Sequence, residues 1–334
     1  MFGNNQKKLK VGVVGVGVLG KHHTRLYNAN KDAELVGVFD VSEKAAKEVA
    51  AEYGVKAFES ELALAAECDA LTIAVPATNH YATAMPIIEM GKHLLMEKPL
   101  AATVEEARNM VEAAEKQKIV FGVGHVERFN AAMDFLQKNR SNTLFIEAHR
   151  LAKYPPPRPG MHRRGTEVSV VLDLMIHDLD LILTMVGSDV ERFDAVGMPV
   201  LSKTEDIANV RLQFKNGAVA NVTASRVSSE PMRKFRVFQT DSYISMDYAK
   251  SSGRIVRKSF LGVATKSVNL CEKNALAEEI DDFVQAVIKS KEGPMLVQPK
   301  VPGRDGLRAL ELASAICDEI ARYNNKYDLY RFKK

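Results

Sequence analysis

The chain has 334 residues, of which 46% are hydrophobic and 26% are charged, a balance typical of a soluble globular protein rather than a disordered one. Its net charge of +4 is too small to indicate a nucleic-acid-binding protein. No apolar run reaches the roughly 18 residues that a membrane helix needs, and the length allows two domains.

The cysteines and the N-terminus indicate a cytoplasmic protein. Cys68, Cys271 and Cys317 are odd in number and far apart, which argues against a disulfide framework and against a metal site, and favours a reducing compartment. The early apolar stretch carries four glycines and ends in Lys21 and two histidines, without a small-residue cleavage site. It therefore predicts a first strand rather than a signal peptide.

The first third of the chain alternates strands and helices. Thr103 and Glu106 form a capping box that predicts a helix start, and Ser42 and Gly54 bound another helix. Continuous apolar strands between amphipathic helices predict a doubly wound parallel sheet covered on both faces. The expected strands are 9–15, 34–40, 68–76, 92–96 and 119–125, and the expected helices are 18–29, 42–54, 80–90 and 103–117.

A different pattern follows residue 124. Helices are expected at 128–139 and 168–186, a strand at 144–152, and long alternating strands from 191 to 260. Hairpin turns are expected at Asn216-Gly217 and Asp241-Ser242. Two helices, about 274–290 and 303–324, close the chain. We therefore predict a Rossmann domain over 1–124, and an α+β domain with a largely antiparallel, open-faced sheet over 125–334.

The sequence GVGVLG supplies Gly15, Gly17 and Gly20 between the first strand and the first helix. In this context the glycines allow a tight turn, the approach of a pyrophosphate and close helix packing. Asp40 ends the second strand, where a carboxylate accepts hydrogen bonds from ribose hydroxyls. It would repel a 2′-phosphate, and residues 41–43 contain no arginine, so the motif favours NAD over NADP.

Glu97, Lys98 and Pro99 follow the strand at 92–96 directly. Ligands of doubly wound sheets lie beyond the carboxyl ends of the strands, so Lys98 is a candidate to stabilise a developing alkoxide. A surface lysine before a helix is an equally good interpretation of the tripeptide alone. Glu97 is expected either near the nicotinamide ribose or as a support of the turn.

Asp173 and His177 stand four residues apart in a predicted helix and so share a face. A histidine there can accept a hydroxyl proton, and the aspartate can bind substrate or orient the ring. Taken alone, the histidine is better explained as a partly buried structural residue. Asp178 and Asp180 lie on other faces and are expected to be exposed.

Polar residues also gather where the second domain is expected to begin. His125, Arg128 and Asn130 occupy that position, and a loop downstream is rich in arginine. Guanidinium groups suit a carboxylate or a diphosphate, although a solvated basic loop explains the pattern equally well. The loop arginines are Arg158, Arg163 and Arg164.

Together these motifs resemble the Gfo/Idh/MocA family of oxidoreductases over nearly the whole chain. The resemblance implies catalysis by Lys98 and His177, with Asp173 beside the substrate and a cis peptide before Pro99. It also implies a homodimer or homotetramer formed through the second-domain sheet. GHVERFN and the segment around His177 are similar to the branch that oxidises the 3-hydroxyl of UDP-N-acetylglucosamine-type sugars. That branch commonly has proline where this chain has Ala131.

Three functions follow as hypotheses. The first is an NAD-dependent dehydrogenase of a sugar or sugar nucleotide. The second is an NAD-dependent glycosidase acting through transient oxidation, and the third is a non-catalytic dinucleotide sensor. The cofactor candidates are Gly15, Gly17, Val18, Leu19, Gly20, Asp40, Pro76, Asn79, His80, Glu97 and Lys98, and the substrate candidates are His125, Arg128, Asn130, Arg163, Asp173 and His177.

Overall fold

The computed structural model describes residues 8–157, 165–248, 250–260, 262–270 and 273–329. Two compact units divide the chain. The first contains Met1–Arg128 and Asn274–Leu307, and the second contains Phe129–Lys273 and Arg308–Lys334. The sequence-based division at residue 124 remains a prediction about domains.

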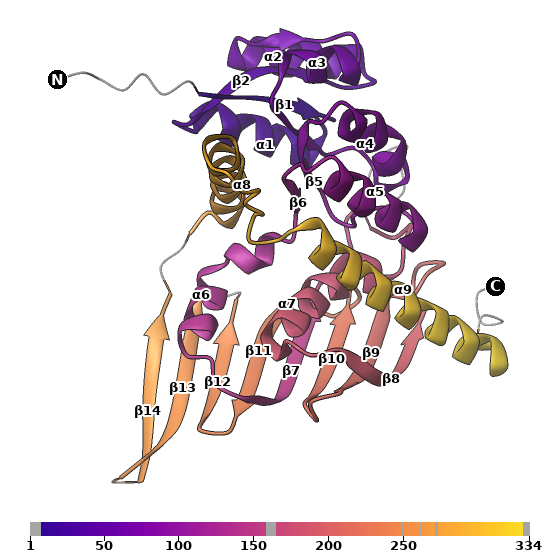
Figure 1. Ribbon diagram of the computed structural model, residues 1–334. Helices are drawn as coiled ribbons and strands as arrows, with labels where there is room; N and C mark the ends of the chain where they lie inside the picture. The colour runs from indigo at the N-terminus through magenta and orange to yellow at the C-terminus, as the bar shows by residue number, and fades with distance from the viewer. Residues whose placement is uncertain (1–7, 158–164, 249, 261, 271–272, 330–334) are drawn as a thin grey trace. The chain divides into compact units, whose positions relative to one another are not determined.

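The first unit is built on a six-stranded parallel sheet of order β3-β2-β1-β4-β5-β6, which confirms the predicted Rossmann architecture (Figure 1). Its strands are β1 (Leu9–Val14), β2 (Ala33–Phe39), β3 (Lys56–Ala57), β4 (Ala70–Ile73), β5 (His93–Met96) and β6 (Phe121–Val123). Its helices are α1 (Val18–Ala29), α2 (Glu43–Tyr53), α3 (Glu61–Glu67), the short η1 (Ala77–Asn79), α4 (His80–Glu89), α5 (Val104–Lys116) and α8 (Ala275–Glu292).

Helices cover both faces of this sheet. On one face, Val11 and Val13 of β1 belong to a buried cluster that also contains side chains of α1, α2 and α8. On the other face, Gly12 lies so close to Leu64 of α3 that an added Cβ would stand 2.9 Å from that side chain. Strands buried on both sides explain the continuous apolar runs in the sequence.

The second unit is built on an eight-stranded sheet of order β14-β13-β12-β11-β7-β10-β9-β8. The neighbours run antiparallel, which confirms the predicted largely antiparallel sheet, except that β7 and β10 run parallel, a pair that was not predicted. The strands are β7 (Thr143–Leu151), β8 (Val190–Met198), β9 (Ile207–Phe214), β10 (Val219–Ser225), β11 (Met232–Gln239), β12 (Ser242–Asp247), β13 (Ser252–Ser259) and β14 (Gly262–Asn269).

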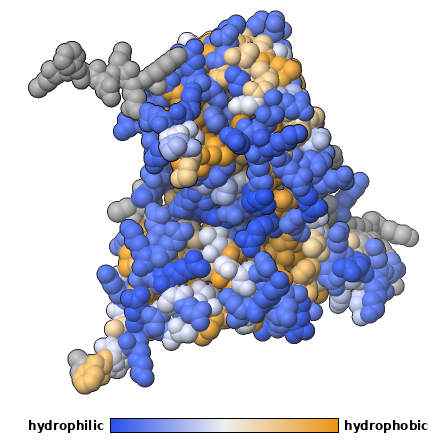
Figure 2. Space-filling model, viewed as in Figure 1, coloured by the Kyte–Doolittle hydropathy of each residue, from blue (hydrophilic) through white to orange (hydrophobic). Residues whose placement is uncertain are grey.

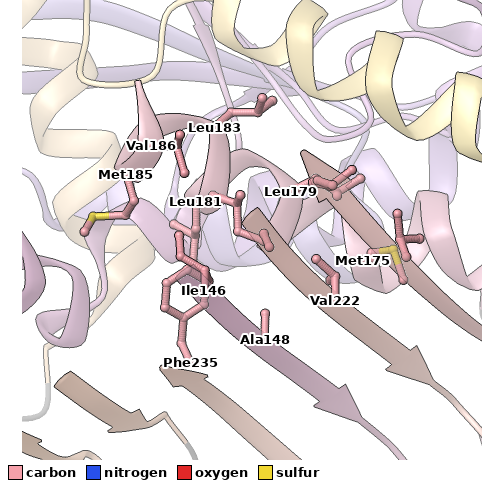
Figure 3. Close-up of a cluster of buried hydrophobic side chains, with 14 of the residues drawn as sticks. Ile146, Ala148, Met175, Leu179, Leu181, Leu183, Met185, Val186, Val222 and Phe235 are labelled. Carbon is pink, nitrogen blue, oxygen red and sulfur yellow. The ribbon is translucent and has the colours of Figure 1, made fainter. Parts of the chain in front are cut away.

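One face of the second sheet is covered by helices. These are α6 (Ala131–Lys138), the π-helical turn η3 (Val171–Met175), α7 (Ile176–Val186) and the later part of α9 (Gly303–Lys326). Figure 3 shows Ile146 and Ala148 of β7, Val222 of β10 and Phe235 of β11 packed against α7. Alternate residues of the same strands point to the opposite face, as the two-residue period of a strand requires.

The structure differs from the expected elements in several places. Residues 171–175 form a π-helical turn inside the predicted helix over 168–186, and the helix expected over 128–139 splits into the 3-10 turn η2 (Val126–Phe129) and α6. The short helices α3 and η1 and the strands β3 and β14 were not predicted. No helix in the described part of the chain combines the length and apolar character needed to cross a bilayer.

Candidate functional site

The glycine loop joins β1 to α1 in a tight turn. Gly15 has a left-handed backbone with φ of 86°, and its amide donates to the carbonyl of Phe39 at 2.8 Å. A Cβ on Gly20 would stand only 1.8 Å from the carbonyl oxygen of Gly15. Both positions therefore require glycine, one for its backbone conformation and the other for the contact between helix and loop.

Gly17 needs no glycine for the fold itself. A Cβ there would meet no heavy atom within 4 Å, and the residue caps α1 without a side-chain hydrogen bond. Val18 is 61% exposed and Leu19 is partly exposed, so the first amides of α1 open to solvent. A helix N-terminus with accessible amides and room for a close approach fits the pyrophosphate of a dinucleotide.

Asp40 stands at the end of β2 and faces the same loop. One carboxylate oxygen accepts a hydrogen bond from the amide of Val16 at 2.8 Å, and the other accepts one from the amide of Ser42 at 2.8 Å. A carboxylate has about four lone-pair positions, so both oxygens keep capacity for the two hydroxyls of a ribose. The structure thus places the predicted acid beside the predicted glycine loop.

Lys98 lies just beyond the carboxyl end of β5, in the turn before α5. The Lys98–Pro99 peptide bond is cis, as the resemblance implied. The Lys98 side chain is partly exposed, and its amide donates to Glu97 Oε2 at 3.2 Å. The lysine therefore stands at the edge of the sheet where doubly wound proteins bind ligands.

Glu97 points into the protein. It is 8% exposed, and its Oε1 is paired with His23 Nε2 at 2.7 Å. Burial would raise the pKa of Glu97, but the hydrogen bond and charge of His23, together with Lys98, lower it. Glu97 was expected either near the nicotinamide ribose or as a support of the turn. These contacts favour the second place, because Glu97 connects the turn to His23 of α1. The His23 partner was not predicted, because residues 74 positions apart carry no local signal.

The turns that follow β4 and β5 are tied together by His80. Its Nε2 lies 3.0 Å from the carbonyl oxygen of Val75, and its Nδ1 lies 2.9 Å from that of Pro99. Burial lowers the pKa of His80 more than these carbonyls raise it. His80 is buried and links the two turns, whereas Pro76 and Asn79 are exposed around η1. Cofactor contact by these three residues remains a prediction.

The residues expected at the start of the second domain fall in both units. His125 and Arg128 belong to the first unit and are 1% and 5% exposed. Arg128 donates a hydrogen bond to Asp305 of the same unit at 2.8 Å. Asn130 belongs to the second unit, where its side chain accepts from the amide of Ala132 at 3.0 Å and caps α6. A substrate role for the three residues remains a prediction. Arg158, Arg163 and Arg164 lie outside the described residues.

Asp173 and His177 both lie in the second unit, on either side of the transition from π-helix to α-helix. The amide of Ile176 donates to the carbonyl of Val171, five residues back, which is the hydrogen bond of a π-helical turn. Both side chains are half-buried. The Asp173 carboxylate lies close against Gly165, where a Cβ would stand 2.3 Å from Oδ2. Turns of this kind occur frequently at functional sites.

Asp178, the neighbour of His177, is buried, contrary to the sequence-based expectation, and so is Asp180. Arg150 of β7 donates to Asp178 through Nε at 2.8 Å and through Nη2 at 3.0 Å. A two-point ion pair fixes the rotation of α7 on the sheet, and with it the direction of His177. The sequence contained no sign of this pair, because arginine and aspartate come from elements 28 residues apart.

A second buried ion pair, also unpredicted, holds the loops before η3. Arg226 donates through Nε to Asp206 at 2.8 Å and through Nη1 to the carbonyls of Gly165 and Val168. Burial alone would raise the pKa of Asp206, but hydrogen bonds from Ser202 and Arg226 lower it to about 2. Among the described residues, no group of His, Cys, Asp and Glu side chains forms a metal site.

Family models match most of the chain. Residues 9–125 match the oxidoreductase family with an NAD-binding Rossmann fold named GFO_IDH_MocA, and residues 142–245 match the GFO/IDH/MocA C-terminal domain. The two matches fall on the two sheets described above. They support a nicotinamide dinucleotide as the cofactor of the first unit.

Known proteins agree with these models. A UDP-N-acetylglucosamine 3-dehydrogenase of Acidithiobacillus ferrooxidans is 37% identical over 84% of this chain and 88% of its own length. A myo-inositol 2-dehydrogenase of Thermotoga maritima is 25% identical over 92% of this chain and 95% of its own. A solved structure of the Acidithiobacillus ferrooxidans enzyme superposes with a TM-score of 0.85 at 36% identity, covering 94% of this chain and 98% of the other. The chain therefore belongs to the Gfo/Idh/MocA family of oxidoreductases.

Proposed function

We propose that this protein is an NAD-dependent dehydrogenase that oxidises a secondary hydroxyl of a sugar nucleotide, at C3 of a UDP-N-acetylglucosamine-type substrate. The observation that carries the proposal is the 37% identity to a UDP-N-acetylglucosamine 3-dehydrogenase over 84% of the chain. The position of Lys98 beyond the carboxyl end of β5 supports a reaction at this edge of the sheet.

The reaction divides between three side chains. Lys98 donates a hydrogen bond to the reacting hydroxyl oxygen and stabilises the negative charge that develops there. His177 accepts the hydroxyl proton, a task suited to an imidazole near neutral pH. Asp173 binds the substrate or orients His177. A bound nicotinamide would take the hydride from the same carbon, which completes a two-electron oxidation of the alcohol to a ketone.

NAD is the proposed cofactor in preference to NADP. Asp40 keeps its carboxylate beside the glycine loop through the amides of Val16 and Ser42. A 2′-phosphate at this position would face a negative charge, and residues 41–43 supply no arginine to balance it. We propose that Val18, Leu19, Pro76 and Asn79 line the same binding region, and that His125, Arg128, Asn130 and Arg163 contribute to substrate binding.

The test is a direct assay of NAD reduction. Formation of NADH is followed by its near-ultraviolet absorbance with UDP-N-acetylglucosamine, with inositol and with free hexoses. Lys98→Gln and His177→Gln are each compared with a matched change at an exposed residue, Lys116→Gln and His22→Gln. We expect activity with the sugar nucleotide, a loss of about 100-fold or more in kcat for the first two variants, and no loss for their controls.

Three results would contradict the proposal or a part of it. Activity with inositol and none with UDP-N-acetylglucosamine would assign another substrate class. Cleavage of a glycoside by NAD-loaded enzyme, without accumulation of NADH, would support transient oxidation followed by elimination. Full activity of Lys98→Gln with the true substrate would remove the lysine from the mechanism in either case.

The protein is further proposed to assemble into a homodimer or homotetramer through the second sheet. Opposite the helices, the sheet exposes an aromatic group in which Phe238 lies 5.5 Å from Phe145 and 4.7 Å from Tyr243 between ring centroids. Figure 2 shows a hydrophilic surface over most of the visible face, with hydrophobic atoms at the far end of the β13–β14 hairpin. Phe260 and Val263 are 103% and 75% exposed there.

Light scattering coupled to size-exclusion chromatography tests this assembly. We expect a mass of two or four chains, and a smaller mass for Phe238→Asp. A monomer at high protein concentration would refute the proposed assembly.

A further inference from the structure

A group of buried polar side chains lies beneath the lysine turn in the first unit. His23 and Tyr27 come from adjacent turns of α1 and are both 0% exposed. Tyr27 forms a 2.8 Å hydrogen bond with Thr72 of β4, and His23 pairs with Glu97 at 2.7 Å. Glu279 of α8 completes the group and is 2% exposed. We call these five residues the α1–α8 polar cluster.

Glu279 is unlike the other acids of the protein core. Neither of its carboxyl oxygens has a hydrogen-bond partner, and the same holds for Nδ1 of His23. Its neighbours along α8, Ile280 and Phe283, belong to the apolar core of the first unit. An ionised carboxylate in such surroundings would lack both a countercharge and a hydrogen-bond donor, which makes its charged form very costly.

The charges that face Glu279 make ionisation still less favourable. Burial raises its pKa well above the ordinary value, and the negative charges of Glu97 and Asp282 raise it further. Lys98 and His23 act instead on Glu97, whose pKa they lower. These opposite directions favour a negative charge on Glu97 and a proton on Glu279.

We propose that Glu279 is a positioning residue for the lysine turn, and that it acts by staying protonated. Neutral Glu279 leaves Glu97 as the single carboxylate beside His23, so that Glu97 remains bonded to His23 Nε2 and to the amide of Lys98. Ionised Glu279 would place a second negative charge in the cluster, weaken the Glu97 contacts and release the turn that carries Lys98. The catalytic consequence rests on the proposed function of Lys98, whereas the proton on Glu279 does not.

The sign of the pH dependence follows from this protonation. A carboxyl group is ionised in the unfolded chain above about pH 4.3, so folding must bind a proton wherever Glu279 is neutral in the folded state. Stability attributable to this group is therefore lost as pH rises from about 4.3 towards the folded pKa. The unfolding equilibrium constant of the wild type rises by up to tenfold per pH unit relative to a variant that cannot ionise there.

Glu279→Gln keeps the shape of the side chain and removes its titration, and Glu278→Gln makes the same change at the exposed neighbour. Urea unfolding of the full chain is measured from pH 5 to pH 9, and the infrared spectrum is searched for the carbonyl band of a protonated carboxyl. We expect the wild type and Glu278→Gln to show the band at neutral pH. We expect Glu279→Gln to lose it and to gain stability over the wild type as pH rises.

Activity supplies the second readout. If the proposed dehydrogenase reaction is found, kcat/KM of the wild type should fall at alkaline pH as Glu279 ionises, and Glu279→Gln should shift or remove that fall while Glu278→Gln keeps it. If the protein has another activity, the infrared and unfolding results still decide the protonation of Glu279. A wild type without the infrared band, or a stability difference that does not change with pH, would overturn the proposal. The band in the wild type needs no variant, so a Glu279→Gln protein that fails to fold leaves the test intact.

Discussion

Two alanine substitutions in the glycine loop separate its structural role from its binding role. At Gly20, an added Cβ would stand 1.8 Å from the Gly15 carbonyl oxygen, so α1 or the loop must move by more than an ångström. Such overpacking costs about 1–3 kcal/mol. At Gly17, the added methyl meets no protein atom within 4 Å, and alanine in place of glycine at a helix cap costs less than about 1 kcal/mol.

Gly17→Ala is expected to be the more stable of the two variants but the weaker binder of NAD. The methyl of Gly17→Ala occupies the space through which a pyrophosphate reaches the first amides of α1. Loss of one charge-assisted hydrogen bond costs about 1.5–3 kcal/mol, which corresponds to about a 10- to 150-fold weaker binding of NAD. We therefore expect Gly17→Ala to unfold like the wild type and bind NAD poorly.

Thermal unfolding without nucleotide and calorimetric titration with NAD measure the two effects separately. Gly20→Ala is the matched comparison, because it changes the same loop by the same methyl group and should be the less stable protein. Unchanged affinity of Gly17→Ala for NAD would refute the assignment of the pyrophosphate to this helix end. A Gly17→Ala protein as unstable as Gly20→Ala would refute the conclusion that the fold has room for a methyl group at Gly17.

Three further outcomes follow from individual contacts. Asp40→Ser combined with Val41→Arg should shift the preference from NAD towards NADP, measured as the ratio of the two dissociation constants. Asp206→Asn should lower the free energy of unfolding, measured in urea at neutral pH. The difference from the wild type should vanish as pH falls towards 2, because the contacts that depress the pKa of Asp206 stabilise only its ionised form. Arg150→Met should cost about 3–5 kcal/mol in unfolding free energy, and adding Asp178→Leu should recover much of it, because the first change alone leaves a buried carboxylate unpaired.

Local patterns predicted the first sheet well. The strands β1, β4, β5 and β6 of the first unit are buried along almost their whole length, so their apolar runs are visible without knowledge of their neighbours. The glycine loop and Asp40 were predictable for a related reason, because β1, the loop, α1 and β2 follow one another directly in the chain. The cis peptide before Pro99 came from family resemblance alone.

Contacts between distant segments could not be predicted in the same way. His23 meets Glu97 across 74 residues, and Arg226 meets Asp206 across 20. Arginine, histidine and aspartate are common at surfaces, so Asp178 was expected to be an exposed acid. Burial of a charged group depends on a partner from another element, and only the packed structure identifies that partner.

The π-helical turn was hidden for a different reason. Apolar residues over 168–186 satisfy a helical period, and one added residue in a turn changes that period too little to be recognised in a short segment. β14 was missed because its side chains are exposed along most of its length, so it lacks the alternation that identifies a half-buried strand.

The return of residues 274–307 to the first unit has a consequence for biosynthesis. The ribosome delivers α8 only after the whole second sheet has been made. Until then, the nascent Rossmann sheet lacks Ile280, Phe283 and Val284, which belong to its apolar core. The N-terminal unit therefore cannot reach its final form during synthesis of its own strands, and a chain interrupted before residue 274 would leave that apolar surface to chaperones or to aggregation.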